Sequence, residues 1–416
     1  MKAKKEVIII GGGVIGLACA HYLIDKGASV RIIEKDTIGD GASHGNCGLL
    51  YFSDVIPLCS PGTVSQEIAR TLKGTSPLYI KPTLDIKRLI WLLKFASKCN
   101  TGQMAKAAKE KYEILNYSIS LFDTLLALKD INCDFEKKGI LSVFKDKKNF
   151  ENHETTNAFL KTYNLGGRRI DKEELQEFEP ALKNDMAGAW LNKADWHLKP
   201  DMLMTSWRKH LSQKGLIIEE HCNVLEFETK GDAVVGVNTI KGNFAADAFI
   251  LATGAWAPKT LRQLKLDLPV QPGKGYSITM ERPGICPSYP CSLYEKSMVV
   301  TPWRSGYRLG GTMEFSGYDN NLNPKRLSKL ISGATAFLRE PVGHPVIEEW
   351  TSLRPMTYDD LPIIDRAPSL ENFIIATGHG MLGLTLATGT GKIVCDMVFG
   401  KTPEINITPF GISRFR

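Results

Sequence analysis

Three glycines near the start of the chain have the spacing that binds a pyrophosphate group. Gly11, Gly13 and Gly16 follow a short apolar run in the pattern G-x-G-x-x-G. In this pattern the first glycine permits a tight turn, the second lets the backbone approach the phosphates, and the third lets a helix pack on the preceding strand. Because unpaired N–H groups and the dipole at a helix N-terminus favour anions, the segment predicts a dinucleotide site.

An acidic residue further along the chain indicates which dinucleotide fits. Glu34 lies about 20 residues after the glycines and ends a second apolar run, as the pattern requires. A carboxylate at this place accepts a hydrogen bond from a free ribose 2′-hydroxyl and repels a 2′-phosphate. The sequence therefore favours FAD or NAD over NADP, and it places Val14, Ile15 and Lys35 beside the same cofactor.

Two strands and a helix must position this turn. Residues 7–10 and 30–33 are rich in β-branched side chains, as is typical of short strands buried on both faces, and the segment between them is predicted to be a helix. The 18 residues from 7 to 24 carry no charge, so a signal peptide or a membrane span is an alternative. The three consecutive glycines and the strand that ends in Glu34 favour a soluble βαβ unit.

Composition limits the class of protein. The chain has 416 residues, of which 43% are hydrophobic and 23% charged, which is ordinary for a globular protein large enough for two domains. The nine cysteines include no C-x-x-C pair, so neither a disulfide framework nor a zinc site is indicated and no metal is expected. The net charge of +7 is spread along the chain without a basic, aromatic-interleaved patch, so nucleic acid is not an expected partner.

The order of the predicted elements gives an α/β fold, α+β overall. A discontinuous Rossmann-like domain for the dinucleotide is expected from residues 1–80, 185–255 and 345–416, and a substrate domain with an antiparallel sheet and helices from 81–184 and 256–344. The remaining predicted strands lie at 140–144, 187–191, within 216–227, and at 249–252, 275–280, 298–302, 307–312 and 373–376. The predicted helices lie within the stretch from Thr83 to Leu128 and at 200–214, 324–338 and 382–399.

Six motifs along the chain resemble those of one family. They are GGGVIGLACAHYL followed by Glu34, GASHGNCGL at 41–49, ATGAW at 252–256, RLGGTMEF at 308–315, SLRPMTYDDLPII at 352–364 and TGHGMLGLTLATGTGK at 377–392. Together they resemble the FAD-dependent amine and amino-acid oxidoreductases of the D-amino-acid oxidase (DAO) superfamily, and within it the small subunit of bacterial D-amino-acid dehydrogenases. The resemblance implies a Rossmann-like FAD-binding domain and a separate substrate domain.

The resemblance also implies which residues hold FAD. The residues expected at the adenosine half, besides the glycine turn, are Glu34, Val224, Thr253 and Gly254. Those expected beside the pyrophosphate and the flavin are Ser43, Asn46, Gly48 and Leu49. Those expected along the isoalloxazine ring, where backbone N–H groups can stabilise negative charge, are Gly378, Gly380, Leu382, Gly383 and Thr385. Some relatives attach the flavin covalently through a histidine near the position of His44, and that alternative stays open.

An arginine is the first candidate for substrate binding. In related oxidoreductases an arginine in the LRP motif binds the substrate carboxylate, and Arg354 occupies that place here. A planar guanidinium can hold a carboxylate bidentately and fix which face of the α-carbon meets the flavin. The alternative is a structural arginine paired with Asp359, Asp360 or Asp365, of which Asp360 stands where the family commonly has glycine.

Two further residues are catalytic candidates by the same resemblance. Tyr276 matches a tyrosine near the substrate, and its alternative role is packing with a hydrogen-bonded hydroxyl. His379 lies beside the flavin in the last motif, where it could bond the ring or tune substrate protonation. Its alternative role is that of a hydrogen-bonded histidine in a turn.

The implied reaction is oxidative deamination of a D-amino acid to a 2-oxo acid and ammonia, with hydride passing from the α-carbon to flavin N5. No second glycine pattern with a strand and an acid around it occurs, so electrons are expected from the substrate rather than from NADPH. They would pass to a quinone, another acceptor or oxygen. The alternatives are a secondary amine or imino acid such as D-proline, D-hydroxyproline or sarcosine, glycine, and a flavoprotein electron-transfer subunit that needs partner chains.

The expected location is the cytoplasm, in amino-acid catabolism. The basic helix predicted at 86–98 is a candidate for contact with a membrane surface, so peripheral attachment to the inner face of the plasma membrane is an alternative. A homo-oligomer and a hetero-complex are both open.

Overall fold

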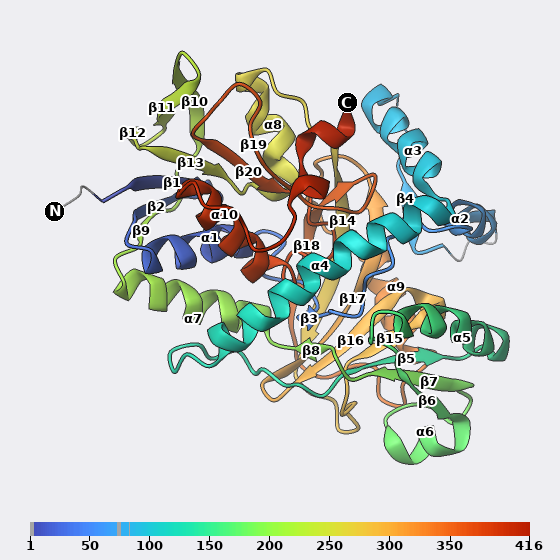
Figure 1. Ribbon diagram of the computed structural model, residues 1–416. Helices are drawn as coiled ribbons and strands as arrows, with labels where there is room; N and C mark the ends of the chain where they lie inside the picture. The colour runs from blue at the N-terminus through green and yellow to red at the C-terminus, as the bar shows by residue number, and fades with distance from the viewer. Residues whose placement is uncertain (1–3, 73–75, 83) are drawn as a thin grey trace.

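The first of two main sheets carries the predicted dinucleotide turn. Our computed structural model describes residues 4–72, 76–82 and 84–416 (Figure 1). The sheet has the order β19-β20-β13-β1-β2-β9, and every pair in it is parallel except that of the edge strand β19 with β20. Its strands are β1 (Glu6–Ile10), β2 (Ser29–Ile33), β9 (Ile217–Glu219), β13 (Ala248–Leu251), β19 (Ile363–Arg366) and β20 (Phe373–Thr377).

Both faces of this sheet are covered, which explains why its strands are apolar throughout. Val7 and Ile9 of β1 pack on one side, and Ile8 and Ile10 pack on the other. The elements on the first side are the helices α1 (Val14–Asp25), α7 (Pro200–Gln213) and α10 (Ala387–Val398). Those on the second are α8 (Ala257–Leu261) and a small sheet of β10 (Val224–Lys230), β11 (Ala233–Thr239) and β12 (Gly242–Ala245).

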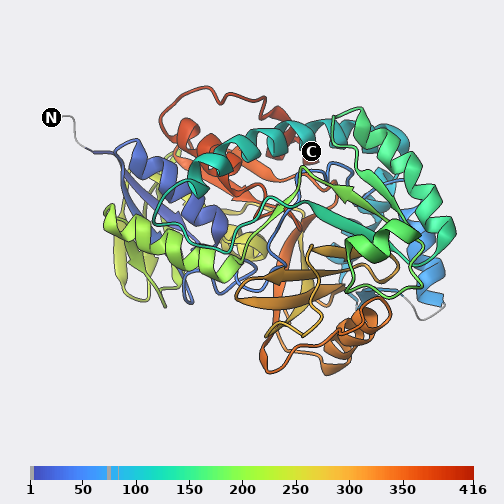
Figure 2. The same cartoon turned by 90° about the horizontal axis from the view of Figure 1, so that it is seen from below.

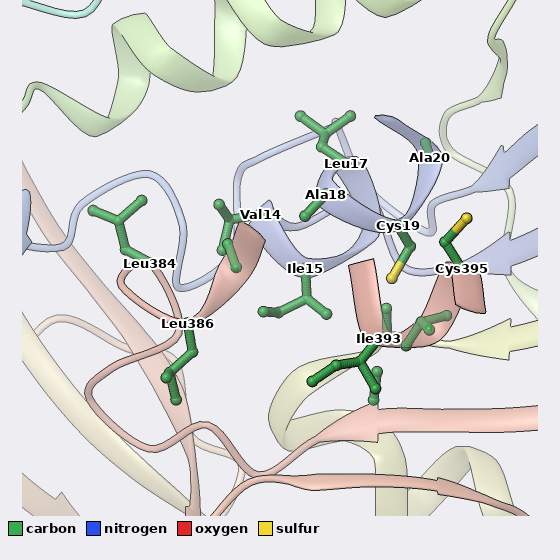
Figure 3. Close-up of a cluster of buried hydrophobic side chains, with 14 of the residues drawn as sticks. Val14, Ile15, Leu17, Ala18, Cys19, Ala20, Leu384, Leu386, Ile393 and Cys395 are labelled. Atoms are coloured by element: carbon green, nitrogen blue, oxygen red, sulfur yellow. The ribbon is translucent and has the colours of Figure 1, made fainter. Parts of the chain in front are cut away.

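The last long helix of the chain packs directly on the first. Figure 3 shows Ile15 and Cys19 of α1 facing Ile393 and Cys395 of α10. The helices approach so closely that a Cβ on Gly391 would lie 2.5 Å from the carbonyl oxygen of Ala18. This packing brings the turn before α10 to the glycine turn before α1.

The second sheet is larger and mainly antiparallel. Its strands have the order β18-β14-β17-β16-β15-β5-β7-β6, with β4 beside β17. The helix α9 (Pro324–Thr335) packs on one face, and the other face contacts the loop 41–48, where Ser277 Oγ donates to the carbonyl of Gly45 at 2.8 Å. The strands are β4 (Leu78–Ile80), β5 (Ile140–Phe144), β6 (Arg168–Asp171), β7 (Gly188–Asn192), β14 (Val270–Met280), β15 (Cys291–Leu293), β16 (Met298–Trp303), β17 (Gly306–Phe315) and β18 (Val346–Thr357).

The helical stretch predicted after residue 83 forms two helices, and its first residue, Thr83, lies outside the described residues. They are α3 (Ile86–Lys98) and the long α4 (Thr101–Leu126), which Figure 2 shows along one side of the molecule. The side chain of Asn100 caps α4 by accepting a hydrogen bond from the N–H of Gln103 at 3.1 Å. The other elements are β3 (Leu49–Leu50), α2 (Thr63–Leu72), α5 (Lys147–Lys161), α6 (Lys172–Phe178), β8 (Trp196–His197) and 3₁₀ turns at Gly254–Trp256, Arg262–Leu264, Tyr294–Lys296, Thr408–Phe410 and Ile412–Phe415.

The predicted mixed α/β class is confirmed, but the sheets cross the predicted domain boundaries. Strands β4, β7 and β18 belong to the second sheet, although their residues fall inside the ranges 1–80, 185–255 and 345–416. Long-range pairing decides which sheet a strand joins, and that information is not local to the strand. Two helix boundaries also differ: α10 starts at Ala387 because residues 382–386 form a turn, and α9 ends at Thr335.

The uncharged segment 7–24 forms β1 and α1. Across residues 4–72, 76–82 and 84–416, no helix combines the length and the apolar character needed to cross a bilayer.

Candidate active site

A cavity of about 1310 Å³ lies between the two main sheets. Its walls are the loops after β1, β2 and β13, the segment 39–58, the strands β14, β17 and β18, and the turn 379–384. Side chains of α2 and α3 line its outer part. Ligand pockets are typically about 300–1,000 Å³, so this cavity has room for a dinucleotide and a small second molecule.

The glycine turn at the end of β1 is packed too tightly for side chains. A Cβ on Gly11, which has φ +108°, would lie 2.5 Å from the carbonyl oxygen of Ala252, and one on Gly16 would lie 2.1 Å from that of Gly11. The N–H of Val14, in the first turn of α1, is bonded to Ser43 Oγ at 2.8 Å. Gly13, Val14 and Ile15 line the cavity, so the N-terminus of α1, where a phosphate is favoured, lies at the cavity wall with Ser43 beside it.

Glu34 lies at the end of β2 and also faces the cavity. Its carboxylate accepts hydrogen bonds from the N–H groups of Gly12 at 2.6 Å and Asp36 at 3.0 Å. Burial raises the pKa of Glu34, which these hydrogen bonds oppose. Across the cavity, Thr253 Oγ1 is buried and has no hydrogen-bond partner among the described residues.

A buried arginine holds the loop that follows. Arg308, which is 1% exposed, donates from Nη1 to the carbonyls of His44 at 3.1 Å and Asn46 at 2.7 Å. Its Nε donates to Thr279 Oγ1 at 2.9 Å. The motif RLGGTMEF does not indicate this role for Arg308, because only the fold shows that its side chain reaches a loop 264 residues away.

His44 itself is not among the residues that line the cavity. Its Nε2 lies 2.8 Å from Glu348 Oε1, which sits on β18. The geometry therefore disfavours covalent attachment of a flavin through His44.

Most of the predicted cofactor residues line the cavity, and four do not. Gly16 and Gly48 permit close packing, the latter because its Cβ would lie 1.9 Å from the carbonyl oxygen of Leu198. Gly378 also permits close packing, because its Cβ would lie 2.8 Å from the side chain of Thr357. Thr385 Oγ1 accepts a hydrogen bond from the N–H of Tyr51 at 3.1 Å. Those that line it are Gly11, Gly13, Val14, Ile15, Glu34, Lys35, Ser43, Asn46, Leu49, Val224, Thr253, Gly254, Gly380, Leu382 and Gly383.

Arg354 lines the cavity from β18, and backbone groups hold its side chain. Nη1 donates to the carbonyl of Thr312 at 3.0 Å, and the guanidinium lies against Gly275, where a Cβ would be 2.3 Å from Nη2. Thr312 has φ +64°, an unusual conformation for a β-branched residue, next to a register shift between β14 and β17. The irregularity turns the Thr312 carbonyl to the arginine.

The three carboxylates proposed as structural partners of Arg354 are engaged elsewhere. Asp359 binds Arg414 Nε at 2.8 Å, and Asp365 accepts from the N–H of Ile412 at 2.8 Å. Asp360 binds Lys111 Nζ of α4 at 2.9 Å. The ion-pair alternative for Arg354 is therefore wrong, and no carboxylate of the described residues lies within ion-pair distance of it. Burial lowers the pKa of Arg354, so the guanidinium is a desolvated cation that an anionic ligand would stabilise.

The DAO family, described as FAD dependent oxidoreductase, has a sequence model that matches residues 6–397 of this chain. The chain belongs to the DAO family. Among curated relatives, a D-amino acid dehydrogenase from Neisseria meningitidis is 30% identical over 417 residues, which is 99% of this chain and 100% of the relative. Another, from Helicobacter pylori strain 26695, is 30% identical over 400 residues, 95% of each chain.

Solved structures show the same DAO fold. Glycine oxidase from Geobacillus kaustophilus superposes with a TM-score of 0.78 at 22% identity and covers 99% of both chains. L-proline dehydrogenase from P. horikoshii superposes with a TM-score of 0.74 at 19% identity and covers 100% of this chain and 98% of that one. At these identities the likeness concerns the fold alone.

The DAO-family cofactor FAD fits the residues present. The glycine turn and the open start of α1 suit a pyrophosphate, and Glu34 retains acceptor positions for ribose hydroxyls. The unpartnered Thr253 hydroxyl adds a polar group at the adenosine side. The backbone of the turn 380–383 closes the opposite wall of the cavity.

Tyr276 of β14 is among the residues that line the cavity, but its side chain packs into the core of the second sheet. It is 1% exposed, belongs to the core cluster beneath α9, and donates from its hydroxyl to Glu314 Oε2 at 3.2 Å. Burial raises the pKa of this hydroxyl. The geometry favours the packing role, and a role at the substrate stays a prediction.

His379 is a neutral, hydrogen-bonded residue of the turn before α10. Its Nε2 lies 3.0 Å from Thr390 Oγ1. Burial lowers the pKa of the imidazole to about 3, so the ring is neutral rather than cationic near neutral pH. A role in tuning substrate protonation is disfavoured.

The low pKa of His379 predicts how folding responds to acid. The unfolded histidine binds a proton below about pH 6.5 and the folded one does not, so the stability present above that pH is lost as the pH falls toward 3. His379→Gln should reduce the slope of the free energy of unfolding of the holoenzyme by about 1.4 kcal/mol per pH unit in this window. The measurement is denaturant unfolding at a series of pH values. If His379→Gln leaves the pH dependence of the free energy of unfolding unchanged, the imidazole is not neutral and buried. The same conclusion would follow if the variant lost an inflection that the wild type shows near neutral pH in kcat/KM.

Proposed function

We propose that this DAO-family chain oxidatively deaminates D-amino acids to 2-oxo acids and ammonia and passes the electrons to a quinone or another acceptor. The observation that carries the proposal is Arg354, a half-buried cation that lines the cavity beside the FAD cradle and has no carboxylate partner among the described residues. The relatives named D-amino acid dehydrogenase, 30% identical over nearly the whole chain, support the same substrate class.

Arg354 binds the substrate carboxylate. Nη1 is held by the Thr312 carbonyl, and Gly275 leaves the space in which the guanidinium lies. A fixed planar guanidinium accepts a carboxylate in one orientation, which sets the face that the α-carbon presents. Since the arginine is desolvated, a bound carboxylate gains more from this contact than it would in water.

The chemistry that bound FAD supplies is two-electron oxidation, with the hydride of the substrate α-carbon passing to flavin N5. The chain supplies a cavity whose walls around Arg354 include the apolar side chains of Leu58, Leu382 and Met356. These side chains exclude water while the carboxylate is held. Because burial lowers the pKa of His379, we assign it a neutral, hydrogen-bonded place in the cavity wall rather than a proton-transfer role.

The reaction is tested by product analysis. Purified holoenzyme is incubated with single D- and L-amino acids, D-proline, D-hydroxyproline, sarcosine and glycine, together with an artificial quinone-type acceptor. We expect D-amino acids to give equal amounts of 2-oxo acid, ammonia and reduced acceptor. Turnover of secondary amines without ammonia would redirect the proposal to imino acids. FAD binding without turnover of any compound would indicate a subunit that needs partner chains.

An exposed apolar surface at the outer part of the cavity supports contact with a membrane surface. Such contact would favour a quinone as the electron acceptor and a cytoplasmic location at the inner face of the membrane. This surface, here called the α3 face, consists of Leu84, Ile86, Leu89, Ile90 and Leu93, with side chains 47–106% exposed. Lys87, Lys94 and Lys98 lie on the same helix. The combination of apolar and basic residues on one helix is typical of helices that lie in the interface of anionic bilayers. Figure 1 shows α3 and α2 together at one edge of the molecule.

Charges placed on the α3 face should weaken this contact. Leu89→Asp with Leu93→Asp is expected to lower the fraction of holoenzyme that sediments with anionic vesicles about tenfold or more, since two apolar side chains of 57% and 63% exposure can no longer enter the interface. Leu225→Asp with Ile240→Asp, at 52% and 60% exposure on the small sheet, is the matched control and should bind like the wild type. If both double variants sediment equally with anionic vesicles, the α3 face does not contact the membrane.

A further inference from the structure

Asp54 is an acidic side chain of the cavity wall that has no partner among the described residues. Asp54 lies between β3 and α2 and lines the same cavity as Arg354. Its carboxylate accepts no hydrogen bond and forms no ion pair within the part of the chain that the structure describes. Glu34 and Glu67 of the cavity wall differ: Glu34 accepts from two backbone N–H groups, and Glu67 binds Arg70 at 2.9 Å and Ser76 at 2.8 Å. Asp40, which also lines the cavity, is exposed, whereas Asp54 is half-buried.

The charged groups around Asp54 provide no net positive charge. Lys111 of α4 acts on it, but Lys111 is bound to Asp360 at 2.9 Å, and the two side chains are 2% and 10% exposed. The charges of this buried pair largely cancel at Asp54. Asp195 and the hydroxyl of Tyr51 also lie close enough to interact electrostatically with Asp54, and neither supplies a positive charge. Burial consequently raises the pKa of Asp54 more than Lys111 lowers it.

The backbone holds Asp54 in a fixed position. Ser53 is bonded to Asp195 through its N–H at 2.8 Å and its hydroxyl at 2.6 Å. The N–H of Tyr51 donates to Thr385 Oγ1 at 3.1 Å, and the N–H of Asp54 donates to the carbonyl of Tyr51 at 3.3 Å. A side chain on so anchored a segment is preorganised for a ligand rather than free to turn to another partner.

We propose that Asp54 binds a cationic nitrogen of the substrate. The cavity then presents a half-buried cation without an anion, Arg354, and a carboxylate without a cation, Asp54, which complement a carboxylate and a cationic group of one ligand. The inference rests on the proposed amino-acid substrate. The nitrogen is either the α-ammonium group or a cationic group at the end of the substrate side chain, and both would form the same charge-assisted hydrogen bond.

The test compares wild-type holoenzyme with Asp54→Asn, which keeps the size of the side chain and removes its charge. D-alanine, D-lysine and propionate are titrated anaerobically, and apparent Kd values are taken from the flavin absorbance. Propionate has the carboxylate but no nitrogen. We expect the variant to bind an amino acid about 10- to 100-fold more weakly and propionate equally well. A loss for both amino acids assigns the contact to the α-ammonium, and a loss for D-lysine alone assigns it to the side chain.

Equal amino-acid affinities in the two proteins would overturn the inference, and so would a loss of propionate binding as large as that of the amino acids. If the wild-type holoenzyme binds neither amino acid, both the proposed function and this inference are contradicted. If the wild type binds them and the variant binds them equally well, only this inference fails. If Asp54→Asn does not retain FAD, Asp54→Ser replaces it. Asp232→Asn, on the turn between β10 and β11, is the control and should leave all three affinities unchanged.

Discussion

Replacing Arg354 by alanine is expected to lower kcat/KM for the amino-acid substrate by about 10²- to 10⁴-fold while FAD stays bound. Two charge-assisted hydrogen bonds to a carboxylate contribute about 1.5–3 kcal/mol each, and every 1.4 kcal/mol corresponds to about tenfold in rate or affinity. The cavity would keep its FAD cradle, because Arg354 contacts Gly275 and Thr312 rather than the glycine turn. The measurement is steady-state kinetics with an artificial acceptor, with the flavin spectrum as the check on loading.

Two further variants make this result specific. Arg354→Lys should recover only part of the loss, since an ammonium keeps the charge without the bidentate geometry. Arg304→Ala removes an arginine whose side chain is 74% exposed, and it should match the wild type. If Arg354→Ala retains wild-type kcat/KM, the carboxylate contact is wrong.

Replacing Gly16 by alanine should yield a chain that does not retain FAD. The new Cβ would lie 2.1 Å from the carbonyl oxygen of Gly11, a backbone atom that cannot move without shifting β1 or α1. Overpacking costs about 1–3 kcal/mol even where side chains can adjust, and here the displaced element is the phosphate cradle itself. We expect a colourless or unstable protein, assessed by flavin absorbance after purification and by thermal unfolding.

Gly102→Ala provides the matched control for Gly16→Ala. Gly102 lies in α4, and its Cβ would meet Asn100 Oδ1 at an ordinary 3.6 Å. Because alanine favours a helix over glycine, this variant should bind FAD normally and unfold at the same or a higher temperature. A Gly16→Ala protein that binds FAD and melts like the wild type would contradict the tight strand-to-helix packing.

The first βαβ unit could be predicted from the sequence because its determinants are local. The glycine spacing, the apolar strands and Glu34 lie within one short segment, and each takes the expected place. Strands β4, β7 and β18 could not be assigned in this way, because their partners lie far away in the chain. The start of α10 was also misplaced, because residues 382–386 have helix-compatible types but form a turn against the cavity.

The candidate site shows the same division. The position of Arg354 in its motif indicated that it lines the cavity. That it forms no ion pair with Asp360 could not be predicted, because Asp360 binds Lys111, which lies 249 residues away in the sequence. Asp360 has φ +58°, a conformation that glycine adopts readily, and its carboxylate forms an ion pair with Lys111 of α4. Asp54 carried no local signal, since only the fold reveals that no cation of the described residues forms an ion pair with it.

Anaerobic bleaching of the bound flavin tests amino-acid oxidation most directly, because it needs no electron acceptor or partner chain. Wild-type holoenzyme is mixed with matched pairs of D- and L-amino acids, and the flavin absorbance is followed. We predict rapid bleaching by at least one D-amino acid, slow or absent bleaching by its L-enantiomer, and loss of the fast phase in Arg354→Ala. An oxidised flavin that no D-amino acid bleaches, or bleaching that is undiminished in Arg354→Ala, would contradict oxidation of a carboxylate-anchored D-amino acid in this cavity.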